Sequence, residues 1–362
     1  MKLLYITNGI NGSGGLERVL SVKVSMLAEK FGYEVSVMVL NQTHQNPFYE
    51  FSSKIKFYSI EVGGNPLRYW ESYKNGIQKT VDTINPDVIA VCDDGLKAFF
   101  VPTFLKTNAK IIYERHVSKL IEARAGQGTV KKFITKLKWF LMGKFGARFS
   151  KFIVLTEGNK NEWPTLKNVE VISNPLSFYP DKTAVLENKT VICVGKIAYQ
   201  KGQDLLVKAW EKIIQKYPDW KLELYGKANE SFLKTDHLKE KNIYFFPPQK
   251  NIDEKYLDSS VYVMSSRFEG FGMVLIEAMA CGVPCVSFDC DYGPGDIIED
   301  GEDGFLVEKE NTDDLAEKLM LLIENEAMRK RFGINAKENV KRFLPENILL
   351  KWDELFKTLK AQ

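Results

Sequence analysis

The sequence predicts an α/β protein built from two doubly wound domains, each with a parallel sheet covered by helices on both faces. Short apolar runs rich in β-branched residues alternate with helical segments along the whole chain. The runs are apolar almost throughout, which is typical of parallel strands buried on both faces. The pattern restarts near residue 190, and 362 residues exceed the roughly 100–200 residues of one usual domain.

The first half contains six runs that we predict as strands. A helix over Leu16–Lys30 lies between the first two and ends near Gly32, so residues 3–40 form one βαβ unit. The six runs are LLYIT (3–7), EVSVMVL (34–40), KIKFYSI (54–60), DVIAV (87–91), KIIYE (110–114) and KFIVLT (151–156).

The second half repeats the alternation of strands and helices. Its predicted helices include Gln203–Gln215 and Gly272–Cys281. Its predicted strands are TVICVG (190–195), WKLELYG (220–226), IYFFP (243–247), SVYVMS (260–265) and VPCVSF (283–288).

The predicted domain organisation is 1–172, a linker over 173–189 with two prolines and little pattern, and 190–345. The helical tail from Thr312 breaks near Pro345, and its last piece, 346–362, is a candidate to cross back to the first domain. Ligands of doubly wound sheets bind outside the carboxyl ends of the strands, so the expected site is an interdomain cleft.

Composition excludes several classes of protein. A net charge of +3 does not by itself indicate a nucleic-acid partner. The N-terminus reaches Asn8 before an apolar core of signal-peptide length forms, so we expect no secretion through a cleaved signal peptide. No later run approaches 18 apolar residues, so we expect no membrane-spanning helix. Cys281, Cys285 and Cys290 are clustered, but no histidine lies near them in the sequence and their spacing matches no zinc pattern. We therefore expect a cytoplasmic protein with buried thiols and no metal.

Two glutamates stand out in the stretch SSRFEGFGMVLIEAMACGVP (265–284). Glu277 is a lone acid within an apolar helix, and Glu269 lies eight positions earlier in a glycine-rich loop. A buried carboxylate without partners is costly, and vicinal hydroxyls of a ribose would compensate that burial. Free N–H groups at the helix start favour a phosphate or a sugar oxygen. The alternative is a capping acid with a core glutamate paired to a lysine.

Two other loops could contact an anion. In VGKIAYQKG (194–202), Lys196 and Lys201 follow a strand and precede a helix, where a diphosphate would need about two positive charges. The loop NGINGSGGLERVL (8–20) carries Gly14 and Gly15, which permit a close approach of the backbone to a ligand. Its spacing is not the G-x-G-x-x-G of dinucleotide-binding folds. Solvated lysines and a tight strand-to-helix turn are the alternatives.

These motifs occur together in a known family. EGFGMVLIE, an E-x7-E arrangement followed by AMACGVP, resembles retaining glycosyltransferases of family 4, which have the two-domain GT-B fold. GGLERVL, VGKIAYQKG and DYGPGDIIEDGEDGFLV (291–307) are similar to further family segments in the same order.

The resemblance implies a role for each motif residue. Glu269 would contact the transferred sugar, Glu277 the ribose of the donor, and Lys196 and Lys201 its diphosphate. His116, in YERH, matches a histidine that faces the donor sugar in many members. Gly14 and Gly15 would let the first domain close over donor and acceptor. The diphosphate would also meet the backbone of Gly270, Phe271, Gly272, Met273 and Val274.

The sequence departs from the family pattern at two places. Lys196 stands where arginine is usual, so bidentate phosphate binding is lost and only the charge remains. The segment YGKANE (225–230) lacks the usual second glycine, which affects the expected contact with the base.

The implied function is retaining transfer of a hexose from a nucleoside-diphosphate sugar to a hydroxyl of a glycan or lipid-linked acceptor in surface polysaccharide or lipopolysaccharide synthesis. UDP is favoured because relatives most often use it, and no cofactor or metal is expected. Asp289-Cys290-Asp291 resembles a D-x-D metal signature but lies within a segment that fits the metal-free family. The alternatives are a nucleotide-sugar epimerase of the same fold, a non-catalytic nucleotide-sugar-binding protein and a dinucleotide oxidoreductase.

A basic segment, Thr129–Lys151, holds seven Lys or Arg residues and no acids. On a helix, Phe133, Ile134, Leu137, Phe140 and Leu141 fall on one arc, opposite four lysines. Such a helix could rest on an anionic membrane, which would make the protein peripheral on the inner face of the cell membrane. It could equally pack its apolar arc on the sheet and leave the basic face in solvent.

Overall fold

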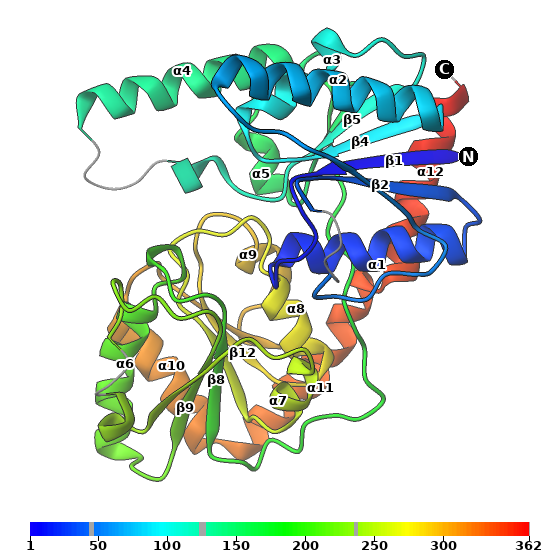
Figure 1. The fold of residues 1–362 in the computed structure, drawn as a ribbon. Helices are drawn as coiled ribbons and strands as arrows, with labels where there is room; N and C mark the ends of the chain where they lie inside the picture. Colours follow the sequence, from blue (N-terminus) through cyan, green and yellow to red (C-terminus); the bar gives the residue numbers. More distant parts are fainter. Residues whose placement is uncertain (43–46, 123–127, 235–237, 362) are drawn as a thin grey trace. The chain divides into compact units, whose positions relative to one another are not determined.

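The computed structural model describes residues 1–42, 47–122, 128–234 and 238–361. It divides into two compact units (Figure 1). Unit 1 comprises Met1–Pro175 and Pro345–Gln362, and unit 2 comprises Leu176–Leu344. Each unit contains a parallel sheet with helices on both faces, which confirms the predicted fold class.

Unit 1 contains a seven-stranded sheet in the order β3-β2-β1-β4-β5-β6-β7. All neighbouring strands are parallel. The strand order reverses between β1 and β4, where ligands of such sheets usually bind. The strands are β1 (Lys2–Thr7), β2 (Glu34–Leu40), β3 (Lys56–Ile60), β4 (Val88–Cys92), β5 (Lys110–Glu114), β6 (Lys151–Val154) and β7 (Val169–Val171).

Helices of unit 1 cover both faces of its sheet, with α1 and α12 on one face and α2 and α4 on the other (Figure 1). The α-helices are α1 (Gly15–Glu29), α2 (Pro66–Ile84), α3 (Val101–Phe104), α4 (Thr129–Gly146), α5 (Glu157–Asn161) and α12 (Pro345–Ala361). The described residues of unit 1 also form the 3₁₀-helices η1 (Leu96–Phe100) and η2 (Lys119–Glu122).

Unit 2 contains a six-stranded parallel sheet in the order β10-β9-β8-β11-β12-β13. Its strands are β8 (Thr190–Val194), β9 (Lys221–Tyr225), β10 (Ile243–Phe246), β11 (Val261–Met264), β12 (Cys285–Phe288) and β13 (Gly304–Val307). Its α-helices are α6 (Gln203–Lys216), α7 (Ile252–Leu257), α8 (Met273–Ala280), α9 (Pro294–Ile297), α10 (Thr312–Glu324) and α11 (Glu326–Asn339). Its 3₁₀-helices are η3 (Tyr199–Lys201), η4 (Leu238–Lys241) and η5 (Val340–Phe343).

The boundary between the units falls at Pro175, so residues 176–189, which the sequence predicts as linker, are part of unit 2. Leu176 and Leu186 are buried there. The Ala184 amide donates to the Cys281 carbonyl at 2.8 Å, at the end of α8. Tertiary burial thus orders a segment that has no periodic pattern of its own.

The last helix, α12, lies in unit 1 although unit 2 precedes it in the sequence. It packs on α1, and its residues Trp352 and Phe356 are buried. Lys30, at the end of α1, forms an ion pair with Glu346 at 2.8 Å. Across the described ranges, none of the helices is long and apolar enough to cross a membrane.

Candidate functional site

Most of the predicted donor-binding residues lie at the carboxyl ends of the strands of unit 2. The loop after β8 leads through η3 into α6, and the loop after β11 leads into α8. Because β8 and β11 are neighbours in the sheet, these two loops lie side by side. Parallel strands of this kind place their ligand at this edge.

Two glycines allow the backbone of neighbouring loops to approach closely at this edge. Gly202, with φ +62°, is the N-cap residue of α6, and a Cβ there would overlap the carbonyl of Ser265, the residue after β11. Gly293, with φ +105°, approaches the Phe271 carbonyl in the same way. Both positions combine a left-handed backbone with direct backbone contact, so only glycine fits without a shift.

Glu269 and Lys201, to which the sequence assigned separate contacts, interact directly with each other. The Lys201 ammonium lies 2.6 Å from Glu269 Oε1. The Ser266 hydroxyl donates to the same oxygen at 2.5 Å. Glu269 is 5% exposed, so this carboxylate is held almost completely inside the protein. Within the ranges that the structure describes, both of these contacts are to Oε1, and we find no hydrogen bond to Glu269 Oε2.

Lys196, the other lysine that is predicted to bind the diphosphate, differs from Lys201 in its surroundings. Lys196 is exposed, and its ammonium forms no ion pair or hydrogen bond within the described part of the chain. Lys201 is 18% exposed and is paired with an acid. Both lysines follow β8, but the Lys201 ammonium is already paired with an acid, whereas the Lys196 ammonium is exposed to solvent.

Glu277 is buried in α8, with 2% of its surface exposed. Its Oε1 accepts a hydrogen bond from the Ser177 hydroxyl at 3.1 Å. Ser177 was missed by the sequence analysis because it lies in the segment predicted as linker. No motif marks it, so its contact with α8 could not be read from the sequence.

The start of α8 provides backbone groups to the same edge of unit 2. Among the described residues no side chain caps α8, whose N-cap residue is Gly272. Gly270, Phe271 and Gly272 are buried, and the first two helical residues are half-buried. The Phe271 ring packs edge-on against Phe343, at 5.4 Å between centroids, so this residue offers its backbone and not its side chain. Met273 and Val274 are those first two helical residues.

Arg267 is a cation that the sequence analysis did not single out. Its two terminal nitrogens lie 2.9 and 2.7 Å from the Asp204 oxygens, and its Nε lies 3.1 Å from Glu310. Burial raises the pKa of Asp204, but the Arg267 guanidinium outweighs burial and holds that pKa below its ordinary value. The Arg267 side chain therefore links the start of α6 to the loop after β11 through its ion pair with Asp204. We assign it no ligand.

The remaining predicted residues lie in unit 1. Gly14 and Gly15 are exposed at the start of α1, after β1. His116 follows β5, and its Nε2 lies 3.3 Å from Glu114 Oε2. Glu114 also contacts Lys23, and both side chains of that ion pair are buried.

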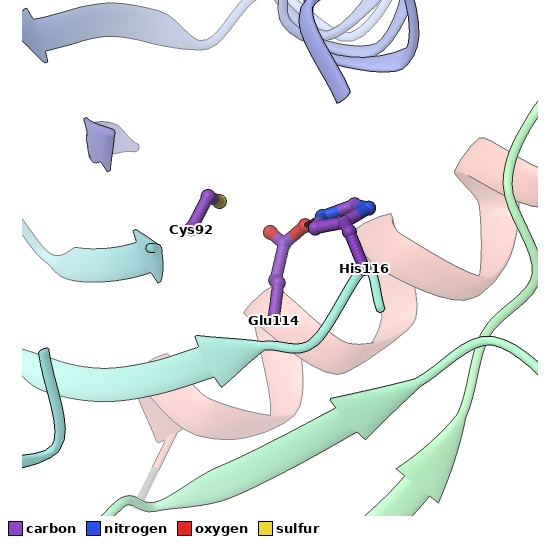
Figure 2. A group of neighbouring side chains, drawn as sticks. All are labelled: Cys92, Glu114 and His116. Atoms are coloured by element: carbon purple, nitrogen blue, oxygen red, sulfur yellow. Dashed lines mark hydrogen bonds and ion pairs between the residues drawn. The ribbon is translucent and has the colours of Figure 1, made fainter. Parts of the chain in front are cut away.

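Cys92, Glu114 and His116 place one potential metal-ligand atom each within 4.8 Å of the others (Figure 2). Lys23 already supplies a cation to Glu114. Burial and the nearby Glu114 carboxylate raise the pKa of the Cys92 thiol, whereas metal binding requires a thiolate. The chemistry of this cluster therefore fits a buried ion pair that also contacts His116 better than a metal centre.

The two acids of the D-x-D segment are both exposed. Asp291 forms an ion pair with Lys309 at 2.5 Å, and its carbonyl accepts from the Glu269 amide at 3.3 Å. Asp291 therefore has a structural role beside Glu269. That this segment binds no metal stays a prediction.

Helix α4 exposes the apolar arc that the sequence analysis placed either on a membrane or on the sheet. Only its last part is buried, at Met142 and Gly146. Packing of the whole arc on the sheet is therefore wrong. The exposed apolar side chains are Val130 (74%), Phe133 (68%), Ile134 (57%), Leu137 (47%) and Phe140 (67%).

Comparisons with known proteins agree with this fold. Two solved structures are similar to the chain at 18% identity, over 98–99% of this chain and 99% of theirs: TarM from S. aureus, with a TM-score of 0.80, and sucrose-phosphate synthase from Thermosynechococcus elongatus, with a TM-score of 0.83. Both similarities show the GT-B fold. Residues 178–339, nearly all of unit 2, match the family described as glycosyl transferases group 1.

A relative in sequence extends this match to the whole chain. The amylovoran biosynthesis glycosyltransferase AmsD of Erwinia amylovora is 31% identical over 98% of this chain and 99% of its own length. The chain belongs to the glycosyl transferases group 1 family. It is therefore a glycosyltransferase.

Proposed function

We propose that this chain is a retaining, metal-independent hexosyltransferase that uses a nucleoside-diphosphate sugar, with UDP the favoured nucleotide. The acceptor is a hydroxyl of a glycan or lipid-linked precursor in surface polysaccharide or lipopolysaccharide synthesis. The observation that carries the proposal is the pair of buried acids, Glu269 and Glu277, beside Lys201 at one edge of unit 2. The biosynthetic name of AmsD and the UDP bound in the TarM structure support the choice of product and donor.

In this proposal Glu277 binds the ribose of the donor. An ionised carboxylate accepts two hydrogen bonds from vicinal hydroxyls, which compensates its burial in α8. Ser177 donates to Oε1 and thereby holds the carboxylate in one orientation. The ribose then lies beside α8, whose uncapped first turn faces the phosphates.

The diphosphate binds Lys196, Lys201 and the backbone of residues 270–274. Negative charge develops on the leaving phosphate as the bond to the sugar breaks, and fixed cations with helix N–H groups stabilise that charge. The two ammonium groups and the start of α8 supply this stabilisation from the protein itself. This is why we propose that the reaction needs no metal.

Glu269 contacts the hydroxyls of the transferred sugar in this proposal. Its Oε1 is held by Ser266 and Lys201, so Oε2 is the atom that accepts from the sugar. Because Lys201 contacts both Glu269 and the proposed phosphate position, one ammonium couples recognition of the sugar to recognition of the diphosphate.

Unit 1 contributes His116, Gly14 and Gly15 to the proposal. His116 contacts the donor sugar, and the two glycines let the backbone after β1 approach the donor and acceptor. These roles rest on the family resemblance of the motifs.

Peripheral contact with an anionic membrane is a further part of the proposal. Five large apolar side chains are exposed on α4 among lysines, in a segment without acids. Apolar insertion and attraction of lysines to anionic lipids act together on such a helix. A lipid-linked acceptor would be met at that surface.

The central test is UDP binding by the Glu277→Gln variant. The wild-type protein is expected to gain stability with UDP, by about 2.7 kcal/mol at a hundredfold excess over Kd. Loss of a charged hydrogen-bond acceptor is expected to weaken UDP binding roughly 10–100-fold. Glu317→Gln, at an exposed position of α10, is the matched control and should bind UDP normally. Equal affinity of the two variants for UDP would contradict the ribose role.

Transfer itself is tested with a panel of nucleotide sugars and acceptors. UDP release that depends on an acceptor distinguishes transfer from epimerisation, which consumes no acceptor. The product should keep the anomeric configuration of the donor, as read by NMR. Turnover that disappears with a chelator and returns with a divalent cation would show the metal-independent mechanism to be wrong.

A further inference from the structure

His116 contacts Glu114, which forms a buried ion pair with Lys23. Lys23 of α1 is 1% exposed and Glu114, the last residue of β5, is 2% exposed, and their charged groups are in contact. The Lys23 ammonium also lies 4.3 Å from the Trp352 ring centroid and 5.1 Å from that of Tyr5. A buried pair of this kind is often no more stabilising than apolar side chains of the same volume. Stability alone therefore does not explain why this ion pair is buried here.

Glu114 is ionised and faces His116. Burial raises its pKa, but the Lys23 ammonium and the hydrogen bond from His116 outweigh burial, and the net pKa lies below the ordinary value. An ionised carboxylate can only accept hydrogen bonds. The His116 nitrogen 3.3 Å from Glu114 Oε2 is Nε2, so Nε2 must carry the proton of this contact.

The other ring nitrogen of His116 is left without a partner. Nδ1 is buried and has no hydrogen-bond partner among the residues that the structure describes, and the whole side chain is 7% exposed. Figure 2 shows the Glu114 carboxylate between Cys92 and the imidazole, so the acid occupies one side of the ring only. A buried acceptor without a partner is costly, and a hydroxyl donated by a ligand would satisfy it.

We propose that Lys23 and Glu114 are positioning residues that hold His116 in the tautomer with Nε2 protonated, so that Nδ1 accepts a hydrogen bond from a hydroxyl of the donor sugar. The sugar contact rests on the proposed function, whereas the tautomer does not. Lys23 acts by keeping Glu114 ionised, and Glu114 acts by accepting from Nε2. Neither residue touches the substrate.

The decisive readout is the imidazole ¹⁵N NMR spectrum, which reports the tautomer without any substrate. The chain has three histidines, and loss of one signal set in His116→Asn assigns that of His116. In the wild-type protein we expect protonated Nε2 and unprotonated Nδ1. The opposite tautomer in the wild-type spectrum overturns the proposal without any further variant.

The matched variants are Lys23→Met/Glu114→Gln and Lys30→Met/Glu346→Gln. The first removes both buried charges together, which avoids leaving one of them unpaired. The second removes an exposed ion pair in the same unit, with side chains 57% and 56% exposed. We expect mixed tautomers of His116 in the first and the wild-type tautomer in the second.

Activity separates positioning from simple structural support. For Lys23→Met/Glu114→Gln we expect kcat for UDP-sugar turnover to fall about tenfold, equivalent to ~1.4 kcal/mol, with UDP affinity within about twofold of wild type. Mixed tautomers with unchanged kcat would overturn the proposal. A locked tautomer in a wild-type protein that turns over no nucleotide sugar would support the role of Glu114 and contradict the proposed function.

Discussion

At the scale of single residues, the candidate donor site depends on how buried acids are held. Glu269 accepts from Ser266 and Lys201 through one oxygen, and Glu277 accepts from Ser177. Each hydrogen bond restricts a carboxylate to one orientation before any ligand arrives. Such preorganisation would lower the cost of ordering the site for the proposed donor.

Ser266→Ala is expected to separate sugar recognition from nucleotide recognition. The hydroxyl donates to Glu269 and has no place in the proposed ribose or diphosphate contacts. We therefore expect kcat/KM for the nucleotide sugar to fall about tenfold, as for loss of one hydrogen bond to a charged group, while UDP affinity changes less than about twofold. Calorimetric UDP titration and donor turnover measure the two quantities.

The matched control is Ser287→Ala. Ser287 is equally buried in unit 2, but its hydroxyl donates to the Phe288 carbonyl and not to an acid of the site. Turnover by this variant should stay near that of the wild-type protein. If Ser266→Ala weakens UDP binding as much as turnover, the separate role assigned to Glu269 is wrong.

At the scale of helices, α4 and α8 differ in the burial of their apolar residues. Residues Leu275–Ala280 of α8 are all buried within unit 2. In α4 the buried residues are Met142 and Gly146, and the preceding turns expose their apolar side chains between lysines. A surface of this composition favours an anionic, partly apolar partner.

Phe133→Ser/Phe140→Ser is expected to weaken binding to anionic vesicles at least about tenfold. Full burial of one such side chain contributes about 1.5–3 kcal/mol, so losing two affects partitioning strongly. Co-sedimentation with phosphatidylglycerol vesicles measures the change, and added salt should weaken wild-type binding because the lysines are screened. Phosphatidylcholine vesicles should bind less.

The control for this test removes exposed apolar side chains elsewhere. Leu67 is 82% exposed in unit 1 and Ile334 is 68% exposed in unit 2. Leu67→Ser/Ile334→Ser should leave vesicle binding unchanged. Equal loss in both double variants would assign the binding to general surface hydrophobicity, and concentration-dependent dimerisation through α4 would identify a second copy as its partner instead.

At the scale of the whole molecule, the alternation of apolar runs with helical segments predicted the architecture, because buried parallel strands are apolar along their length. Two short strands escaped this reasoning. The β7 strand has three residues, Val-Glu-Val, all half-buried, and β13 begins with Gly304. Neither forms an apolar run long enough to distinguish from a loop, so their pairing depends on the sheet beside them.

The composition of the candidate site was predictable, but its contacts were not. The motif spacing identified Glu269 and Lys201, yet their ion pair joins residues 68 positions apart and depends on β8 lying next to β11. Lys23 carried no signal, because a lysine in an amphipathic helix is normally solvated. Its burial depends on Glu114, 91 positions away, and on Trp352 of the last helix.

Truncation after Leu344 is expected to destabilise unit 1 and to spare unit 2. The removed helix α12 buries six apolar side chains in unit 1, and full burial of each contributes about 1.5–3 kcal/mol, so the loss should exceed several kcal/mol. Loss of Trp352 would also remove one of the rings that pack against the buried Lys23 ammonium.

Calorimetry measures the effect of this truncation. The transition assigned to unit 1 should occur at a lower temperature or be absent. UDP should still raise the remaining transition, because its proposed ligands lie in unit 2. Simultaneous loss of UDP binding and of both transitions would show that the two units do not fold independently.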